Sequence, residues 1–315
     1  MIKENEATRA PKKAYPQLVT ARNAWITGGI LAGLFVIGLF ADLQISEALY
    51  NESNPIGIFG AAYGEIPAEL AMLLGGLMLI MFSNKEKIWL KVLQIVLGAI
   101  PLAFGVFMLL WSPTEYIDGP ALLLVVITAV FGGAVVWFVY VNVKDADRAV
   151  GVRVASTVLL VTFAEMVLVN VVKFTWLRPR MRMLSEFGDQ AHYQAVYVPG
   201  APDYMETLVA DGVGLGEFTS FPSGHTANAA LAIVFVAFVL LSRKWEGAQN
   251  RIYWVGIVWG LYVALSRIIM GAHFLTDTVA GFTITFLLVL AAIRIAFPTA
   301  KQLGAPSESV KTSGN

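Results

Sequence analysis

The chain has 315 residues, of which 57% are hydrophobic and 14% charged, and its 22 basic and 22 acidic residues give a formal net charge of zero. With a mean hydropathy of +0.69, this composition excludes an ordinary soluble globular protein and predicts a polytopic membrane protein. The sequence has no cysteine, which excludes disulfides, thiolate catalysis and cysteine-ligated metals, and its three histidines argue against a histidine-rich metal site. We therefore expect no metal and no cofactor.

Eight apolar runs alternate with polar connections along the chain. They lie at 25–41, 66–82, 92–111, 119–141, 154–172, 226–242, 252–268 and 278–297. Each is about 17–25 residues long, which is enough for a helix to cross the hydrocarbon core of a bilayer. The sequence therefore predicts an all-α, polytopic membrane helix bundle with about eight transmembrane helices over 25–297, between a basic tail at 1–24 and a second tail at 298–315.

The basic residues are distributed unevenly over the connections. Seventeen of the 22 belong to the side that holds the two tails and the even-numbered connections. The positive-inside rule therefore places both termini in the cytoplasm and the odd-numbered connections outside. The five remaining basic residues are Lys173, Arg178, Arg180, Arg182 and Arg267. They fall in the same two outer connections as all three histidines, and this clustering indicates an anion site on the outer face.

The stretch 266–277 reads S-R-I-I-M-G-A-H-F-L-T-D and holds the first candidate residues. His273 and Asp277 are four residues apart, so on a helix they share a face, and the carboxylate can accept the imidazole Nδ1–H and leave Nε2 basic. Arg267 offers a fork of donors suited to phosphate oxygens. The alternative is an arginine whose head reaches the interface and a histidine that merely caps a helix.

The stretch F-P-S-G-H-T-A-N at 221–228 opens the sixth apolar run. Pro222 and Ser223 are typical of a helix start, and Gly224 allows a ligand to approach the backbone closely. The first amides of this helix form a natural phosphate cradle, and His225 in the same turn is placed to donate a proton to a leaving oxygen.

The fifth run ends in V-V-K-F-T-W-L-R-P-R-M, which places Lys173, Arg178 and Arg180 at the outer boundary. For Lys173 alone, an ammonium group that reaches the interface is the simpler interpretation. Inside the same run, Glu165 either supports Lys173 or pairs with a neighbouring helix, and we favour the structural role. Asn228, one turn after His225, is expected to face the site.

Together, K-x6-R at 173–180, P-S-G-H at 222–225 and S-R-x5-H-x3-D at 266–277 resemble the motifs of the type 2 phosphatidic acid phosphatase family, in its membrane lipid phosphatase branch. This family shares its catalytic core with glucose-6-phosphatase and vanadium haloperoxidases. The second and third motifs match fully. In the first, the family pattern is K-x6-R-P, whereas Met181 follows Arg180, and the pair Arg178–Pro179 lies two residues earlier. Arg178 is therefore a rival to Arg180 for the motif position.

The resemblance implies a six-helix phosphatase core over roughly 90–297 and a role for each matched residue. His273 is the implied nucleophile that forms a phosphohistidine, Asp277 orients it, and His225 protonates the leaving group and then activates water. The implied phosphate-binding groups are Lys173, Arg180, Ser223, the Gly224 amide and Arg267. Because fixed cations and helix-end amides balance the phosphoryl charge, the reaction is expected to need no metal.

We therefore expect an integral, multi-pass protein of a bacterial cell membrane that hydrolyses a lipid phosphate or lipid diphosphate at the outer leaflet. Phosphatidic acid, phosphatidylglycerophosphate and undecaprenyl diphosphate all fit. The expected partners are the lipid substrate and the bilayer, with no nucleic acid, and the oligomeric state stays open. The alternatives are a lipid phosphotransferase that uses the same site, or a non-catalytic anion or lipid transporter. A transporter predicts paired polar breaks in two halves of the chain, and the sequence shows no such repeat.

Overall fold

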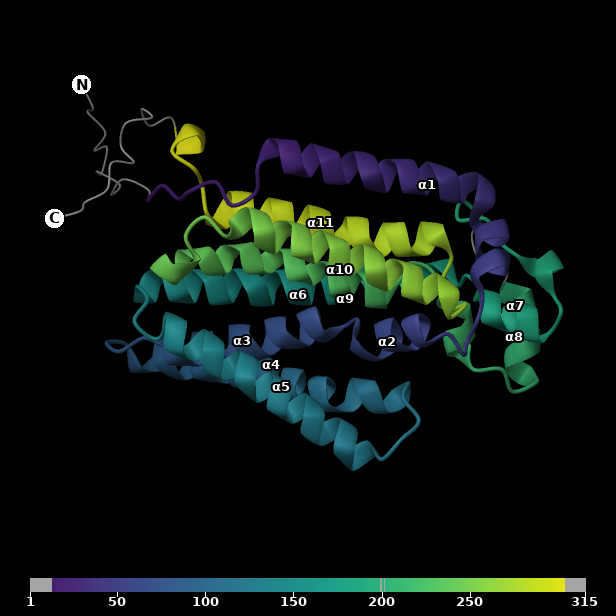
Figure 1. Cartoon of the computed structure of the whole chain (residues 1–315), viewed down its shortest axis with the longest axis horizontal. Helices are drawn as coiled ribbons and strands as arrows, with labels where there is room; N and C mark the ends of the chain where they lie inside the picture. The colour runs from purple at the N-terminus through teal and green to yellow at the C-terminus, as the bar shows by residue number, and fades with distance from the viewer. Residues whose placement is uncertain (1–12, 199, 201, 304–315) are drawn as a thin grey trace, which may run out of the picture.

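The computed structural model describes residues 13–198, 200 and 202–303, and among these residues every regular element is helical (Figure 1). The long helices are α1 (Ala21–Leu49), α3 (Ile66–Met81), α4 (Ile88–Trp111), α5 (Ala121–Val143), α6 (Arg148–Trp176), α10 (Gln249–Ile269) and α11 (Leu275–Ala296). The shorter ones are α2 (Pro55–Tyr63), α7 (Met181–Glu186), α8 (Pro202–Ala210) and α9 (Gly224–Ala230). The 3-10 segments are η1 (Ser112–Glu115), η2 (Gln190–His192), η3 (Leu215–Phe218), η4 (Leu231–Leu240), η5 (Arg243–Trp245) and η6 (Lys301–Leu303).

Seven helical segments of the described chain are long and apolar enough to cross a membrane, which confirms the predicted polytopic helical bundle. The sixth predicted run, 226–242, forms α9 and then ten residues of 3-10 helix, η4. Seven residues at about 1.5 Å and ten at about 2.0 Å still give about 30 Å, the thickness of a hydrocarbon core. Because a 3-10 helix rises further per residue than an α-helix, this short apolar segment is still long enough to cross the hydrocarbon core.

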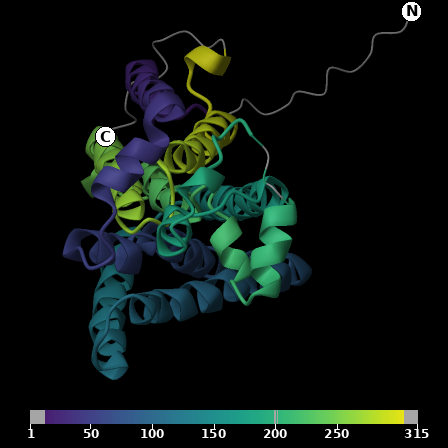
Figure 2. The same cartoon turned by 90° about the vertical axis from the view of Figure 1, so that its right-hand side faces the viewer.

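The α9–η4 segment forms the centre of the bundle and packs against α3, α6, α10 and α11. Its small and β-branched side chains, such as Ala227, Ala230 and Val234, are fully buried. Figure 1 shows α1 on one side of this centre and α4 with α5 on the opposite side. Figure 2 looks onto the end of the bundle where α7 and α8 lie, and the two views agree on this arrangement.

The outer connection between the first two predicted runs, 42–65, is largely helical in the structure, and its helical course is not among the elements that the apolar runs predicted. Helix α1 continues to Leu49 because Asp42 is buried and ion-paired rather than solvated. Helix α2 then begins at Pro55, where the Asn54 side chain accepts hydrogen bonds from the backbone N–H groups of Ile56 and Gly57.

Helices α3 and α4 approach closely because both carry glycine at their crossing. A Cβ added at Gly98 would lie 2.6 Å from the carbonyl oxygen of Gly76, and one added at Gly76 would lie 2.4 Å from the carbonyl oxygen of Gly98. Small residues at such crossings let helix backbones pack directly against each other in a membrane.

Gly98→Ala is expected to lower the free energy of unfolding by about 1–3 kcal/mol, because its methyl group overpacks this crossing. The matched control is Gly33→Ala on α1, where nothing lies within 4 Å of an added Cβ. The control should keep or raise stability, since alanine favours helix over glycine by about 1 kcal/mol. Thermal unfolding of both variants in detergent measures the difference, and equal midpoints for the two would contradict the close-crossing argument.

Candidate active site

The three sequence motifs meet at one end of the bundle, beside α7 and α8 (Figures 1 and 2). Lys173 lies in the last turn of α6, Gly224 begins α9, and Arg267 lies in the last turn of α10. Gly271 makes the turn that follows α10 with a positive φ of 59°, a conformation that suits glycine. His273 follows this turn, immediately before α11.

His273 is 1% exposed, and its Nδ1 lies 2.5 Å from the backbone carbonyl oxygen of Ser220. A carbonyl oxygen only accepts, so Nδ1 carries the proton and Nε2 keeps its lone pair. Burial, followed by the charges of Lys173, Arg180 and Arg267, lowers the pKa of His273 well below its ordinary value. The imidazole is therefore neutral at pH 7, the state that a nucleophile requires.

The expected direct contact between Asp277 and His273 does not occur, and the Ser220 carbonyl takes its place. Asp277 is the third residue of α11, so its carboxylate turns back to accept the Phe274 N–H at 2.8 Å. Its oxygens also accept from the Ser220 hydroxyl at 2.6 Å and from Arg178 at 2.5 Å. The four-residue spacing failed because His273 precedes the helix rather than sharing its face. Asp277 thus reaches His273 through Ser220, and its orienting role stays a prediction.

A cavity of about 310 Å³ collects most of the other predicted residues. Its lining consists of Glu65, Tyr116, Glu165, Met166, Val169, Asn170, Lys173, Arg180, Gly224, His225, Asn228, Arg267 and His273. Within the described chain, Nε of Arg180 and both Nε and Nη1 of Arg267 are buried without a hydrogen-bond partner. Buried donors without partners are costly, so they fit a site that an anion completes.

Lys173 and Ser223 flank the start of α9 in different ways. The Lys173 ammonium donates to the Thr219 carbonyl at 2.9 Å, and its Cε lies 3.6 Å from where a Gly224 Cβ would be. The lysine therefore lies against the bare backbone of Gly224. Ser223 is fully buried outside the cavity lining, and its hydroxyl accepts the Thr226 N–H at 3.3 Å as the helix cap. Its predicted contact with phosphate stays a prediction.

The structure separates the two rival arginines. Arg178 is completely buried, and its guanidinium donates hydrogen bonds to other protein groups. The acceptors are the carboxylates of Asp42 at 3.0 Å and Asp277 at 2.5 Å and the backbone carbonyl of Gln194 at 2.8 Å. Arg180 lines the cavity instead. The spacing K-x6-R therefore agrees with the geometry, while the R-P pair at 178–179 belongs to a buried ion-pair network.

Sequence reasoning missed two residues that approach His225 from the N-terminal half. The Tyr116 hydroxyl lies 3.2 Å from His225 Nε2, and Glu65 lies 3.6 Å from His225 Nδ1. Asn228, which was expected to face the site, donates to Glu65 at 2.6 Å. The only signal in the sequence was that Glu65 borders an apolar run, since no spacing rule links residues 65 and 225.

Glu165 was expected to pair with a neighbouring helix or to support Lys173. Its side chain is 1% exposed and lines the cavity, and its Oε2 has no hydrogen-bond partner among the described residues. Of the two alternatives, this placement favours a position beside the site. No group of three or more His, Asp or Glu residues arranged to hold a metal ion occurs in the described part of the chain.

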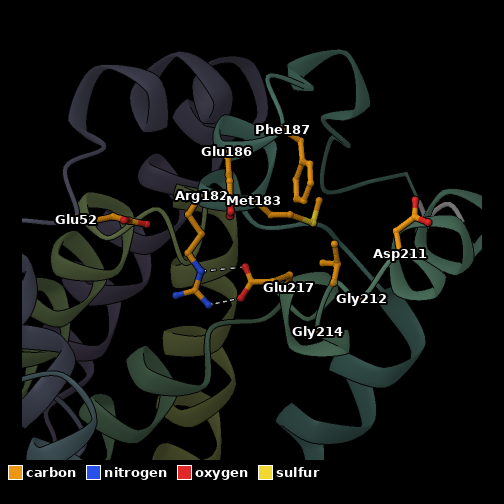
Figure 3. Close-up of a pocket in the computed structure, with 10 residues that line it drawn as sticks. Glu52, Arg182, Met183, Glu186, Phe187, Asp211, Gly212, Gly214 and Glu217 are labelled. Carbon is orange, nitrogen blue, oxygen red and sulfur yellow. Dashed lines mark hydrogen bonds and ion pairs between the residues drawn. The ribbon is translucent and has the colours of Figure 1, made fainter.

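Arg182 belongs to a second pocket of about 490 Å³ among the loops at this end (Figure 3). Figure 3 shows its guanidinium forming two bonds with the Glu217 carboxylate, one of them 2.9 Å long. The Glu217 carbonyl in turn accepts the backbone N–H of Arg180 at 2.8 Å. Burial raises the pKa of Glu217, but the hydrogen bond and charge of Arg182 outweigh it and lower the pKa below its ordinary value. This ion pair therefore holds the segment that carries Arg180.

Residues 154–300, which hold all three motifs, match the model of the PAP2 superfamily. The part of the chain that holds the motifs therefore matches the family that these motifs predicted. Over 71 residues it is 35% identical to phosphatidylglycerophosphatase B of Bacillus subtilis (strain 168), a stretch that covers 22% of this chain and 35% of the relative's length. No solved structure matches the chain.

Proposed function

We propose that this chain is an integral membrane phosphatase that hydrolyses a lipid phosphate or lipid diphosphate through a phosphohistidine intermediate. The observation that carries the proposal is the single cavity that brings Lys173, Arg180 and Arg267 around two histidines, His225 and His273. The family match over 154–300 and the name of the phosphatidylglycerophosphatase relative support the same reaction class. Phosphatidylglycerophosphate is therefore the first substrate to test, beside phosphatidic acid and undecaprenyl diphosphate.

In the first step, Nε2 of His273 attacks phosphorus in line with the leaving oxygen. The P–N bond forms as the P–O bond to the lipid breaks, and His225 gives its proton to the departing oxygen. In the second step, His225 takes a proton from water, the water oxygen bonds to phosphorus, and the P–N bond breaks. Inorganic phosphate leaves and both histidines return to their starting states.

The charges around the cavity supply what phosphoryl transfer needs most. The phosphoryl group spreads negative charge over its nonbridging oxygens, and fixed donors stabilise that charge without reorganisation. Lys173, Arg180 and Arg267 provide three such cations, and the Gly224 amide adds a neutral donor. We propose that these groups make the reaction metal-independent.

The distribution of basic residues indicates at which leaflet of the membrane the cavity opens. The connections near the site hold few basic residues apart from those of the motifs, whereas the opposite side holds seventeen of the 22. By the positive-inside rule, we propose that both termini are cytoplasmic and that the cavity opens at the outer leaflet. An amphiphilic substrate then keeps its chain in the bilayer while its phosphate enters the cavity.

The test is phosphate release by the purified protein in detergent with EDTA, from a panel of lipid mono- and diphosphates and from p-nitrophenyl phosphate. Release from one or two lipids that persists in EDTA is the expected result. Release that depends on added metal would overturn metal independence. Transfer of the phosphoryl group to an added alcohol without free phosphate would replace the hydrolase by a transferase, and no cleavage of any substrate would overturn the proposal.

Glu65→Gln is expected to lower kcat for an alkyl phosphate about 10- to 100-fold, because the carboxylate beside His225 positions the acid and stabilises its charged form. p-Nitrophenyl phosphate, whose leaving group needs little protonation, should lose less. The matched control is Glu69→Gln, one turn further along α3. The Glu69 side chain accepts from the Ser112 hydroxyl at 2.7 Å and does not line the cavity. Equal losses for both substrates would contradict a role in acid catalysis.

A further inference from the structure

The catalytic cavity continues along helix α6 beyond the motif residues. Glu165, Val169 and Lys173 all line it, and their spacing of four residues keeps them on one face of the helix. Val169 Cγ1 lies 3.8 Å from the point that a Gly224 Cβ would occupy, so the start of α9 lies at the level of Val169. Glu165 is one turn further into the bundle, about 6 Å along the helix axis. The cavity therefore has one end at the phosphate cradle of α9 and a second end at Glu165.

The polar atoms of α6 at this second end are hydrogen-bond acceptors. Glu165 is 1% exposed, and its Oε2 has no hydrogen-bond partner among residues 13–198, 200 and 202–303. Asn170, in the same cavity lining, donates through Nδ2 to the Met166 carbonyl at 2.8 Å, so the remaining polar atom of its side chain, Oδ1, is also an acceptor. Because a buried acceptor without a donor is costly, this geometry fits a ligand that supplies a donor.

The charges of the cavity narrow the kind of donor. An ammonium group on the ligand would be repelled by Lys173, Arg180 and Arg267, which line the same cavity of about 310 Å³. A second phosphate would place its acceptor oxygens against the carboxyl groups of Glu65 and Glu165, which are themselves acceptors. A hydroxyl group is neutral and donates, so it avoids both conflicts.

We propose that Glu165 binds a hydroxyl group on the part of the substrate that leaves with the ester oxygen. The inference rests on the proposed function and adds a substrate class: a phosphate monoester of a polyol, with a hydroxyl on the carbon next to the ester carbon. That hydroxyl oxygen is four bonds from phosphorus, a span of roughly 4–5 Å at bond lengths of about 1.5 Å. With the phosphate at the Gly224 amide, such a hydroxyl reaches the depth of the Glu165 side chain.

The kinetic test uses two lipids that differ by this hydroxyl: palmitoyl lysophosphatidic acid, which carries it, and its deoxy analogue, which lacks it. We expect the unmodified chain in detergent to hydrolyse the first with a kcat/KM about tenfold higher, because the analogue leaves the Glu165 acceptor unpaired. Glu165→Met keeps a side chain of similar length without an oxygen and should reduce this ratio to about one. Glu165→Gln keeps an acceptor oxygen and should retain most of the ratio. Equal kcat/KM values for the two lipids in the unmodified chain would overturn the hydroxyl site.

The matched control is Thr162→Val, which removes a polar group from α6 one turn before Glu165. Thr162 donates to the Val158 carbonyl at 3.0 Å and does not line the catalytic cavity, so this variant should keep the tenfold ratio. p-Nitrophenyl phosphate has no hydroxyl in its leaving group, so Glu165→Met should lose less activity with it than with palmitoyl lysophosphatidic acid. Equal proportional losses with all three substrates would mean that Glu165 only supports Lys173, and would overturn the inference.

Calorimetric titration of the two lipids separates this inference from the proposed function. In the His273→Ala variant, which should leave the substrate uncleaved, palmitoyl lysophosphatidic acid should bind about tenfold more tightly than the deoxy analogue. Glu165→Met in the same variant should make the two affinities equal. Equal affinities before that second substitution, with hydrolysis by the unmodified chain intact, overturn the hydroxyl site alone. If the unmodified chain cleaves neither lipid, the proposed function is overturned, and the affinities still decide whether Glu165 binds the hydroxyl.

Discussion

Replacing His273 by alanine is expected to reduce kcat for every phosphate substrate by at least about 10⁴-fold, because the variant loses the atom that bonds to phosphorus. Rapid quenching of the unmodified enzyme with ³²P-labelled substrate should trap an acid-labile phosphoryl group on the protein, and the variant should trap none. The matched control is His192→Ala. His192 is half-exposed, bonds Asp189 and lies outside the cavity lining, so its loss should leave activity intact.

His225→Ala separates the two steps. With p-nitrophenyl phosphate, which leaves without help from an acid, the variant should still form the phosphoenzyme. Hydrolysis of that intermediate should slow by about 10²- to 10⁴-fold, because no base activates water. The trapped phosphoryl group should therefore accumulate above its level in the unmodified enzyme. Substantial phosphate release by His273→Ala, or no accumulation in His225→Ala, would contradict the proposed sequence of steps.

Arg178→Met is expected to lower the free energy of unfolding by about 3–5 kcal/mol, because it leaves two buried carboxylates, Asp42 and Asp277, without their cation. Both carboxylates are at most 2% exposed, so water cannot replace the guanidinium. The thermal midpoint in detergent should fall by many degrees, and activity should be lost together with the folded state. Asp42→Asn in the same chain should restore part of the stability, since one unpaired charge is removed.

Arg180→Met is the matched comparison, because it removes the other arginine of the same motif. Its Nε already lacks a hydrogen-bond partner among the described residues, so little folding energy should be lost. Its kcat should fall about 10²- to 10³-fold, the usual effect of removing one donor from a developing anion. Thermal unfolding followed by circular dichroism measures the stability of both variants, and phosphate release measures their kcat. If Arg178→Met were stable but inactive and Arg180→Met were unfolded, the two roles would be reversed: Arg178 would bind phosphate and Arg180 would stabilise the fold.

Much of this architecture could be predicted from the chain alone, because membrane helices depend on local composition. The apolar runs predicted the helical bundle, and the one that wound as 3-10 helix was still recognised by its hydropathy. The motif residues around His225 and His273 were found because each motif is contiguous and lies at a helix end. The helical course of 42–65 was not predicted, since Asp42, where the first apolar run was expected to end, is buried against the distant Arg178.

The sequence by itself determined the fold class, the family that the motifs resemble, and the cations and histidines of the candidate site, because these depend on neighbours within a few residues. Only the tertiary structure decided which arginine faces the cavity. Arg178 does not face it, because its guanidinium is bound by Asp42 and Asp277, which lie 136 and 99 residues away in sequence. It also decided that Ser220, rather than Asp277, contacts His273, and that Glu65 and Tyr116 flank His225. Such contacts depend on how helices pack, and packing joins residues whose separation in the chain follows no rule.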